Sequence, residues 1–207
     1  MAQRFSAAIR IVYPRLQSLR LAFGWRSALA LRFDLSTPAA LATDLTMAAP
    51  HRGNTGFSTY FITANTFQKH GLFQSDRMAC LFLDVLSHYR AKEKYLLHEF
   101  VIMPDHFHLL ITPKETLERA LQLIKGGFSF RAKRELRFGG EIWEKSFYDH
   151  RVRDWEEDCA FRQYIHLNPV KRGLINVADQ YSYSSAKAGM VLDALPQRLK
   201  PSGGVAV

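Results

Sequence analysis

Cysteine is scarce in this 207-residue chain, which contains only Cys80 and Cys159. The two lie far apart and do not form the short spacing that is typical of metal sites, so we expect reduced thiols in a reducing cytoplasm. Long apolar runs are also missing. No uninterrupted apolar stretch is long enough to cross a bilayer, and we therefore expect no membrane partner.

Lysine is absent from the first 46 residues, whereas arginine recurs there through an apolar background. These arginines interrupt any candidate core of a signal peptide. Three interpretations of residues 1–46 stay open. They form a basic, disordered extension, they are a transit peptide, or translation begins at Met47, which leads straight into the patterned part of the chain. In none of these cases do we assign a function to them.

Positive charge is abundant: 28 Lys and Arg residues against 19 Asp and Glu residues give a net charge of +9. This balance favours a polyanionic partner, although many basic proteins have none. With 47% hydrophobic residues the chain is expected to be globular, and its length allows one domain with a substantial core. We expect that domain to cover residues 47–190, followed by a flexible tail over residues 191–207.

The apolar pattern predicts an α+β domain. Gly126-Gly127 is expected to break or kink the second predicted helix, and Pro169 to end the third. A strand-helix-strand-strand order is typical of a ferredoxin-like antiparallel sheet with helices packed on one face. The predicted strands cover residues 57–64, 95–103, 106–112 and 141–152, and the predicted helices cover residues 76–92, 117–137 and 154–169.

Two histidines, His106 and His108, stand out in the third predicted strand. Side chains alternate along a strand, so both imidazoles lie on one face of the sheet and Phe107 lies on the other. Two neighbouring imidazoles can bind a divalent cation if a third ligand comes from elsewhere. Taken alone, such a pair is more often a polar surface patch.

A second group of chemically active residues lies about fifty residues later, in a helix that begins with a capping-box pattern at Asp154 and Glu157. Tyr164 and Asn168 are four residues apart there and project from one face of the helix. A tyrosine can act as a covalent nucleophile, and an asparagine carbonyl is a hard oxygen ligand. The alternative is a core tyrosine and a helix-ending asparagine.

Together the two stretches resemble the REP-associated tyrosine transposases, which are single-strand DNA transposases with one catalytic tyrosine. Residues 103–110 (Met-Pro-Asp-His-Phe-His-Leu-Leu) are similar to their His-hydrophobic-His (HUH) motif. Residues 164–174 (Tyr-Ile-His-Leu-Asn-Pro-Val-Lys-Arg-Gly-Leu) are similar to their tyrosine-helix motif. The resemblance covers residues 56–185 approximately. It implies an HUH-type ferredoxin-like fold, a bacterial cytoplasmic and nucleoid-associated location, and compatibility with either a monomer or a homodimer.

The resemblance also implies a chemistry. His106, His108 and Asn168 would hold Mg2+ or Mn2+, while Tyr164 would attack a phosphate of single-stranded DNA at a REP-like hairpin. The products would be a 5′-phosphotyrosine and a free 3′-OH, and the reaction could be reversed to rejoin strands. Imidazoles also suit Zn2+, so the identity of the metal stays open. Asp105 is a candidate partner for one of the histidines.

Basic residues near these motifs are candidates for DNA contact, because Arg and Lys bind phosphate oxygens and Phe can stack on unpaired bases. The alternative for the second predicted helix is a solvated basic face with Phe128 and Phe130 in the core. The candidate DNA-binding residues are Lys125, Arg131, Lys133, Arg134, Arg137, Lys171 and Arg172.

Three other functions stay open. They are a non-catalytic protein that binds hairpin DNA, a ferredoxin-like RNA-binding module, and a metal-dependent phosphodiesterase that uses water instead of Tyr164. An RNA-binding module would carry stacking aromatics on the central strands, where this chain has histidines. Tyr148 is a rival nucleophile without a helical asparagine partner. We expect His150 to be a polar residue at a sheet edge and His166 to make a DNA or structural contact.

Overall fold

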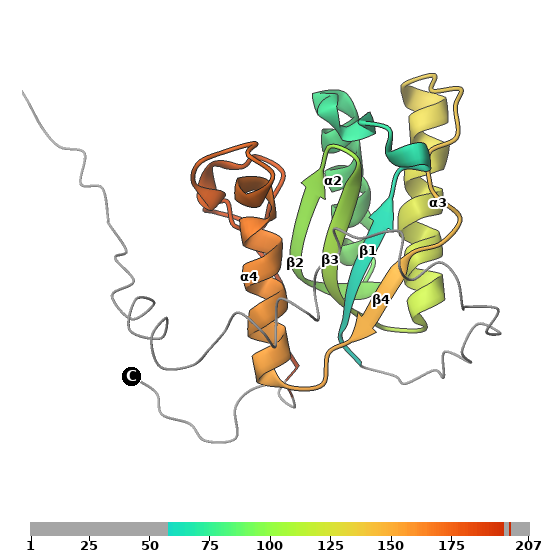
Figure 1. Ribbon diagram of the computed structural model, residues 1–207. Helices are drawn as coiled ribbons and strands as arrows, with labels where there is room; N and C mark the ends of the chain where they lie inside the picture. Colours follow the sequence, from blue (N-terminus) through green and yellow to red (C-terminus); the bar gives the residue numbers. More distant parts are fainter. Residues whose placement is uncertain (1–57, 197–198, 200–207) are drawn as a thin grey trace, which may run out of the picture. The chain divides into compact units, whose positions relative to one another are not determined.

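A four-stranded antiparallel sheet forms the centre of the computed structural model, which describes residues 58–196 and residue 199 (Figure 1). The strand order is β2-β3-β1-β4, which is the ferredoxin-like order, so the predicted α+β class and sheet type are confirmed. The strands are β1 (Tyr60–Asn65), β2 (Tyr95–Met103), β3 (His106–Pro113) and β4 (Tyr148–Arg151). The α-helices are α2 (Asp76–Ala91), α3 (Leu117–Glu135) and α4 (Trp155–Lys171).

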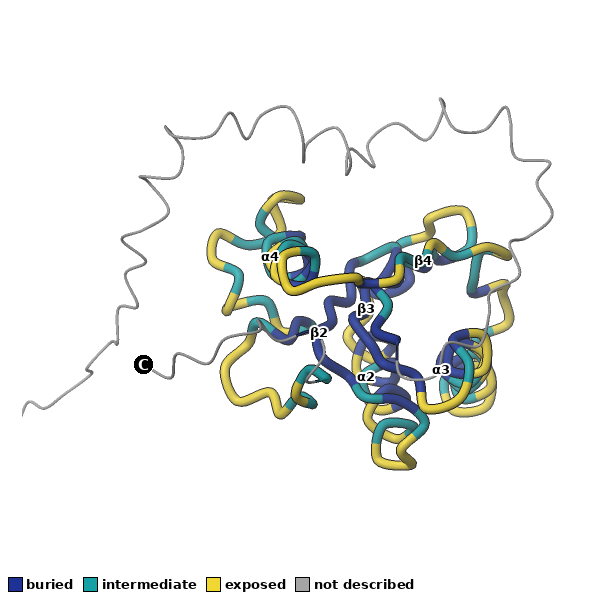
Figure 2. Tube along the Cα trace, turned by 90° about the horizontal axis from the view of Figure 1, so that it is seen from below, coloured by how far each residue is buried: buried dark blue, intermediate teal, exposed yellow. Residues whose placement is uncertain are grey.

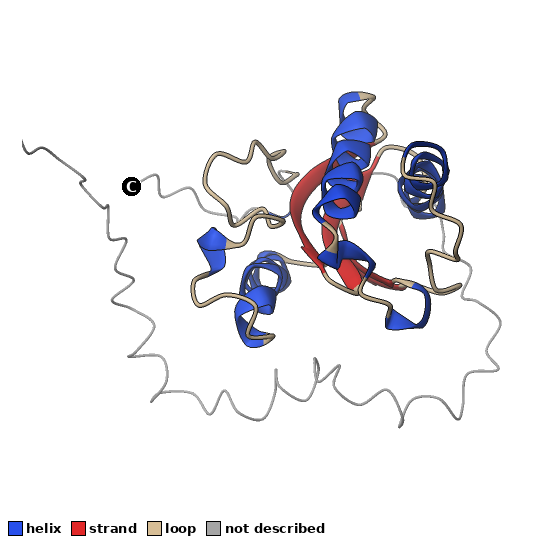
Figure 3. Ribbon diagram, turned by 90° about the horizontal axis from the view of Figure 1, so that it is seen from above, coloured by secondary structure: helices blue, strands red, loops and turns tan. Residues whose placement is uncertain are grey.

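The sheet separates two layers of helices (Figures 2 and 3). Helices α2 and α3 pack on the face that carries Phe107, Leu109 and Ile111 of β3, and together they enclose the main core. There the rings of Phe82 and Phe107 lie 4.8 Å apart, centroid to centroid. Helix α4 lies on the opposite face, so the expectation of helices on one face holds for α2 and α3 alone.

The β2–β3 hairpin turns at Pro104 and Asp105, as the sequence predicts. Strand β1 pairs with the other side of β3 and places Thr63 opposite His108 and Asn65 opposite His106. Both histidines therefore lie on a central strand, between β1 and β2, where the backbone is held from both sides. This rigid position makes β3 a suitable support for a functional site.

The fourth strand is shorter than predicted, and the prediction is wrong over residues 141–147. This segment follows the end of β1 instead, where Phe67 N donates to Ile142 O at 2.9 Å and Glu144 N donates to Asn65 O at 3.1 Å. The physical reason is Trp143, whose ring packs against Phe107 in the core. Trp143 itself forms an isolated antiparallel bridge with Thr66, beyond the end of β1, and its partly buried ring holds the segment there.

Helix α4 continues past Pro169 to Lys171, so the predicted end at the proline is also wrong. A proline in the last turn removes only the single hydrogen bond that its own N–H would make. The following turn is still closed, because Arg172 N donates to Asn168 O at 3.1 Å. The predicted start is confirmed: the side chain of Asp154 accepts a hydrogen bond from Glu157 N at 2.8 Å.

The predicted tail begins too early. The carboxylate of Asp193 accepts hydrogen bonds from Arg90 Nε at 2.8 Å, from Arg90 Nη2 at 2.9 Å and from Leu97 N at 2.8 Å. The chain is therefore attached to α2 and β2 as far as Asp193. The predicted tail at residues 197–198 and 200–207, the extension over residues 1–46 and the alternative start at Met47 lie outside the described residues. No helix among the described residues is long and apolar enough to cross a membrane.

Helix α3 runs unbroken through Gly126-Gly127, contrary to the predicted kink, and the two glycines have different surroundings. A Cβ atom at Gly126 would meet nothing within 4 Å, whereas one at Gly127 would lie 2.6 Å from Cε2 of Tyr89. We expect Gly126→Ala to raise the free energy of unfolding by about 0.5–1 kcal/mol through helix propensity. Gly127→Ala should lower it by about 1 kcal/mol or more through overpacking.

Urea unfolding of both variants measures this difference. An increase in stability for Gly127→Ala would contradict the close packing of α2 against α3 at Tyr89.

Candidate active site

His106 and His108 form the centre of the candidate site. Both side chains are buried on the α4 face of the sheet, and their Nε2 atoms lie 3.1 Å apart. The alternation of side chains along β3 brings both imidazoles to one face, as predicted. The pairing of β3 with β1 and β2 then fixes the position of both histidines relative to the neighbouring strands.

The Nδ1 atom of each histidine has a hydrogen-bond partner that sets the orientation of the ring. Nδ1 of His106 lies 2.6 Å from Oδ1 of Asp105, and Nδ1 of His108 lies 2.8 Å from Oγ1 of Thr63. A neutral imidazole that donates from Nδ1 leaves a lone pair on Nε2. The Asp105 carboxylate, which only accepts, therefore favours the His106 tautomer with a free Nε2 lone pair, as in a metal site. The Thr63 hydroxyl can donate or accept, and it fixes the orientation of the His108 ring.

The electrostatics of the pair agree with this arrangement. Burial, together with the positive charges of His106 and Arg172, lowers the pKa of His108 well below its ordinary value. The hydrogen bond from His106 lowers the pKa of Asp105, so that carboxylate is ionised and can hold the proton on Nδ1. The predicted pairing of Asp105 with a histidine is thus present in the structure.

Asn168 of α4 provides a third polar group at the same place. Its Nδ2 lies 3.0 Å from Nε2 of His108, and rotation of the amide about its last bond brings Oδ1 to that position. No three His, Cys, Asp or Glu side chains suited to a metal ion come together in the described part of the chain, so this set depends on the amide of Asn168. Two imidazole nitrogens and one amide oxygen fit a divalent cation with open coordination positions.

Tyr164, one helical turn before Asn168, lies beside the histidines of its own chain. Its ring centroid is 5.1 Å from that of His108. Burial raises the pKa of the Tyr164 hydroxyl, while a hydrogen bond with Asn168 and the charge of Arg172 oppose this effect. The phenol is therefore protonated near neutral pH and would lose its proton on reaction.

An aromatic stack joins α4 to the sheet beside the site. Phe61 of β1 stacks on Phe161 of α4, with ring centroids 4.3 Å apart, and on His108 at 5.4 Å. Tyr164 meets the same Phe61 ring edge-on at 5.8 Å. The sequence analysis missed Phe61 and Thr63. Their alternation along one strand was visible, but nothing in the sequence shows that β1 pairs with β3 in this register.

The chain matches the family described as "Transposase IS200 like" over residues 58–168, which is more than half of its length. This range contains His106, His108, Tyr164 and Asn168. The chain belongs to the IS200-like transposase family. The membership predicted from the two motifs is confirmed at this level.

Two further comparisons agree with the family. A curated relative from Haemophilus influenzae, named "Putative REP-associated tyrosine transposase", is 26% identical over 155 residues, which are 63% of this chain and 88% of the relative. A solved "Structure of the REP associates tyrosine transposase bound to a REP hairpin" is 20% identical and has a TM-score of 0.55. That match covers 78% of this chain and 99% of the other, and it shows a shared fold.

The C-terminal end of α4 adds positive charge to the site of this transposase. Lys171 Nζ lies 5.6 Å from the ring centroid of Tyr164. The charge of Arg172 lowers the pKa values of Asp105, His108 and Tyr164, so it acts on the same small region. Both side chains are exposed. These two predicted DNA-binding residues therefore lie beside Tyr164 and the histidine pair.

The other candidates near the motifs have structural surroundings. His166 Nε2 lies 2.8 Å from a carboxylate oxygen of Glu99, which makes it a structural contact on the far side of α4 from Tyr164. His150 lies on the edge strand β4, as expected, with Nε2 3.1 Å from Glu157. Tyr148 is 45% exposed on the same edge strand, and the partial burial of its hydroxyl, together with the charges of Asp149 and Glu157, raises its pKa.

The two phenylalanines in the basic half of α3 have different surroundings, so the DNA-contact alternative and the core alternative each fit one of them. Phe128 is completely buried in the core, whereas Phe130 is 62% exposed. Arg134 lies over the exposed ring, 5.8 Å from its centroid. An exposed aromatic ring beside an arginine is a suitable surface for an unpaired base. Neither alternative is right for both phenylalanines.

The remaining basic residues of α3 differ in how free their charges are. Arg131 makes a two-pronged contact with Glu135 at 2.7 and 3.0 Å. Lys125 is half-buried and donates to Glu144 O at 3.0 Å, and its pKa is lowered by burial. Lys133 and Arg137 are exposed, like Arg134. The exposed basic side chains are thus Lys133 and Arg134 of α3 and Arg137 just beyond its end.

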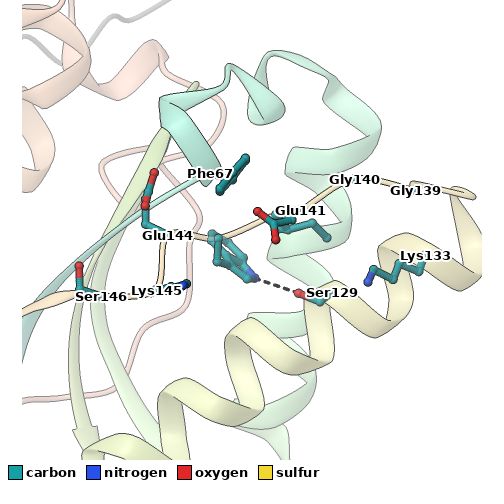
Figure 4. A pocket seen from close by; sticks show the side chains of 11 residues that line it. Phe67, Ser129, Lys133, Gly139, Gly140, Glu141, Glu144, Lys145 and Ser146 are labelled. Carbon is teal, nitrogen blue, oxygen red and sulfur yellow. Dashed lines mark hydrogen bonds between the residues drawn. The ribbon is translucent and has the colours of Figure 1, made fainter.

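Lys133 also borders a cavity of about 450 Å3 between α3 and residues 139–146. Figure 4 shows Phe67 on one side of it, and Ser129 and Lys133 of α3 on another. Trp143 Nε1 donates to Ser129 Oγ at 3.0 Å and so holds the loop against the helix.

Proposed function

We propose that this transposase cleaves and rejoins single-stranded DNA at REP-like hairpins through a covalent bond to Tyr164. The observation that carries the proposal is the meeting of His106 Nε2, His108 Nε2 and the Asn168 amide beside the Tyr164 ring. The names of the curated relative and of the solved structure support the REP hairpin as the DNA.

A divalent cation is part of the proposal. His106, His108 and Asn168 would hold Mg2+ or Mn2+, and their arrangement fits such an ion. Bound there, the cation would polarise a phosphodiester and offset the negative charge that develops during cleavage. Asp105 would keep His106 in the tautomer that a metal ligand needs, and Thr63 would keep the His108 ring oriented.

The covalent step transfers a phosphate from O3′ of the DNA to the Tyr164 oxygen. The Tyr164 hydroxyl loses its proton to solvent, and its oxygen attacks the phosphorus atom. The phosphorus–O3′ bond breaks, and the departing oxygen takes up one proton to become a free 3′-OH. The phosphotyrosine ester conserves the energy of the broken bond, so attack by a 3′-OH rejoins the strand without ATP. Lys171 and Arg172 would hold the neighbouring phosphates.

A covalent-adduct assay tests this proposal. The protein is mixed with labelled single-stranded DNA that carries a REP-like hairpin from beside its own gene, with Mg2+ or Mn2+, and resolved on a denaturing gel. We expect a metal-dependent band of protein-linked DNA. Cleavage without that band would favour the phosphodiesterase that uses water. Binding without cleavage, on several hairpins, would favour a protein that only binds.

The exposed arginine of α3 should contribute to DNA affinity more than its paired neighbour. Arg134→Gln is expected to weaken hairpin binding and to lower the slope of log Kd against log salt by about 1, as for one lost phosphate contact. Arg131→Gln is the matched control, because the Arg131 charge is already paired with Glu135. Fluorescence anisotropy across a salt series measures both slopes. Equal effects of the two variants would contradict the contrast between the free charge of Arg134 and the paired charge of Arg131.

A further inference from the structure

A buried cluster of charged side chains lies between α4 and β2, apart from the histidine pair. Glu99 of β2 is only 5% exposed. Its carboxylate accepts hydrogen bonds from His166 Nε2 at 2.8 Å, from Ser185 Oγ at 2.5 Å and from the guanidinium of Arg162. Hydrogen bonds to an ionised group are strong and directional. Two of these three donors belong to α4, so Glu99 joins that helix to the sheet.

The two α4 partners of Glu99 flank Tyr164 in the sequence. Arg162 comes two residues before it and His166 two residues after it, and two residues turn about 200° around a helix. Arg162 and His166 accordingly contact β2, while the Tyr164 ring contacts Phe61 of β1. Helix α4 is thus held by β2 through Arg162 and His166 and by β1 through Tyr164. Asn168 contacts His108 between these two sets of contacts.

The backbone of β2 is shaped to make this contact. The register between β2 and β3 slips by one residue, so that Leu97 pairs with Ile111 but Glu99 pairs with Leu110. In an uninterrupted ladder Glu99 would face the apolar core under α2 and α3. The β-bulge turns it to the face that carries His108 and α4. A buried carboxylate that depends on a bulge for its direction has a specific position in this fold.

We infer that Glu99 is a positioning residue for the strand cleavage proposed above, because it fixes the rotation of α4 about its own axis. This inference rests on that proposed reaction. Side-chain tips lie about 5–6 Å from a helix axis, so a 10° rotation would move the Tyr164 hydroxyl by about 1 Å. A displacement of about 1 Å can reduce a reaction rate roughly 100-fold. The same rotation would move Asn168 away from His108.

The charges around Glu99 support its role as a fixed anion. Burial alone would raise its pKa, but the hydrogen bonds from His166 and Ser185 and the charges of His166 and Arg162 lower it. Nε of Arg162 also donates to Asp158 Oδ2 at 2.6 Å, so the guanidinium is held at two points. Glutamine at position 99 would keep the shape of the side chain but present an amide group to this cation.

The experiment compares Glu99→Gln with Tyr95→Phe. Tyr95 lies on the same strand but faces the opposite side, where its hydroxyl donates to Leu86 O at 2.8 Å. Removing that buried hydrogen bond lowers stability without touching α4, which makes Tyr95→Phe the matched control. Three quantities are measured on each protein: hairpin Kd, the single-turnover rate of adduct formation, and hydrogen exchange of the α4 amides. Arg162→Lys, a milder change, covers the case in which Glu99→Gln does not fold.

We expect Glu99→Gln to slow adduct formation roughly 10- to 100-fold and to speed exchange in α4, with a Kd within a few-fold of the unmodified protein. Tyr95→Phe should change neither the rate of adduct formation nor hydrogen exchange in α4. Arg162→Lys should give a rate and an exchange between those of Glu99→Gln and the unmodified protein. Adduct formation at the unmodified rate in Glu99→Gln would overturn the inference, and so would a parallel loss of binding and cleavage. If the unmodified protein forms no adduct, the proposed reaction fails, and α4 exchange still decides whether Glu99 holds the helix.

Discussion

Replacing Tyr164 with phenylalanine is expected to remove the covalent DNA adduct and to reduce cleavage by at least about 10³-fold, while hairpin affinity stays within a few-fold. Phenylalanine keeps the ring that contacts His108 at 5.1 Å and Phe61 at 5.8 Å, so α4 should remain in place. The hydroxyl is lost, and with it the attacking oxygen and the hydrogen bond with Asn168. The adduct band on a denaturing gel and the Kd from anisotropy measure the two effects separately.

Tyr148→Phe is the control for this result. Tyr148 is the rival nucleophile, and its ring also meets Phe61 edge-on, at 6.5 Å, but it lies exposed on the edge strand. Adduct formation should survive this change. Cleavage that persists in Tyr164→Phe would instead point to water as the nucleophile. An adduct that disappears in Tyr148→Phe would move the chemistry to the edge of the sheet.

The two chemical motifs could be predicted because each depends on local geometry. Alternation along a strand is enough to bring His106 and His108 to one face. A spacing of four residues is enough to align Tyr164 with Asn168 on a helix. Neither rule says that the helix lies on the face that carries the histidines. The position of α4 depends on where the chain crosses the sheet between β4 and α4. Only the resemblance to the transposase motifs implied that Tyr164 and Asn168 lie near the histidines.

The parts of the site that were missed depend on strand register. Thr63 orients His108 only because β1 pairs with β3 in one particular alignment. Glu99 reaches α4 only because β2 contains a bulge. Both are side-chain contacts between segments far apart in the chain, and a one-residue change of register would reverse them. No pattern within a single strand carries that information.

The wrong predictions within elements have a common physical cause, which is tertiary packing that overrides local preference. A glycine pair predicts a kink, but Gly127 instead lets α3 approach the ring of Tyr89. A strand-like segment predicts continuous pairing over residues 141–147, but there Trp143, whose ring packs against Phe107, forms only an isolated bridge with Thr66. Local propensity is a weak guide wherever a large side chain has a place in the core.

Loss of one histidine of the proposed metal site should have the second large effect. His106→Ala is expected to abolish metal-dependent cleavage, with a loss of at least about 10³-fold, while sparing most hairpin binding. The change removes one of the two Nε2 atoms that lie 3.1 Å apart and leaves the basic surfaces of α3 and α4 intact. Mn2+ affinity, measured by calorimetry or by electron paramagnetic resonance, should fall together with cleavage, because the same three side chains would hold the ion.

His98→Ala separates this effect from a general loss of stability. His98 is also a fully buried imidazole on the neighbouring strand β2, where it contacts Thr112 Oγ1 at 2.8 Å and Asp193 O at 2.9 Å. Its removal should lower the unfolding temperature about as much as His106→Ala does. Mn2+ affinity should nevertheless be unchanged, and cleavage should stay within a few-fold. If His106→Ala retained both Mn2+ affinity and cleavage, the paired histidines would have a structural role and the metal would bind elsewhere.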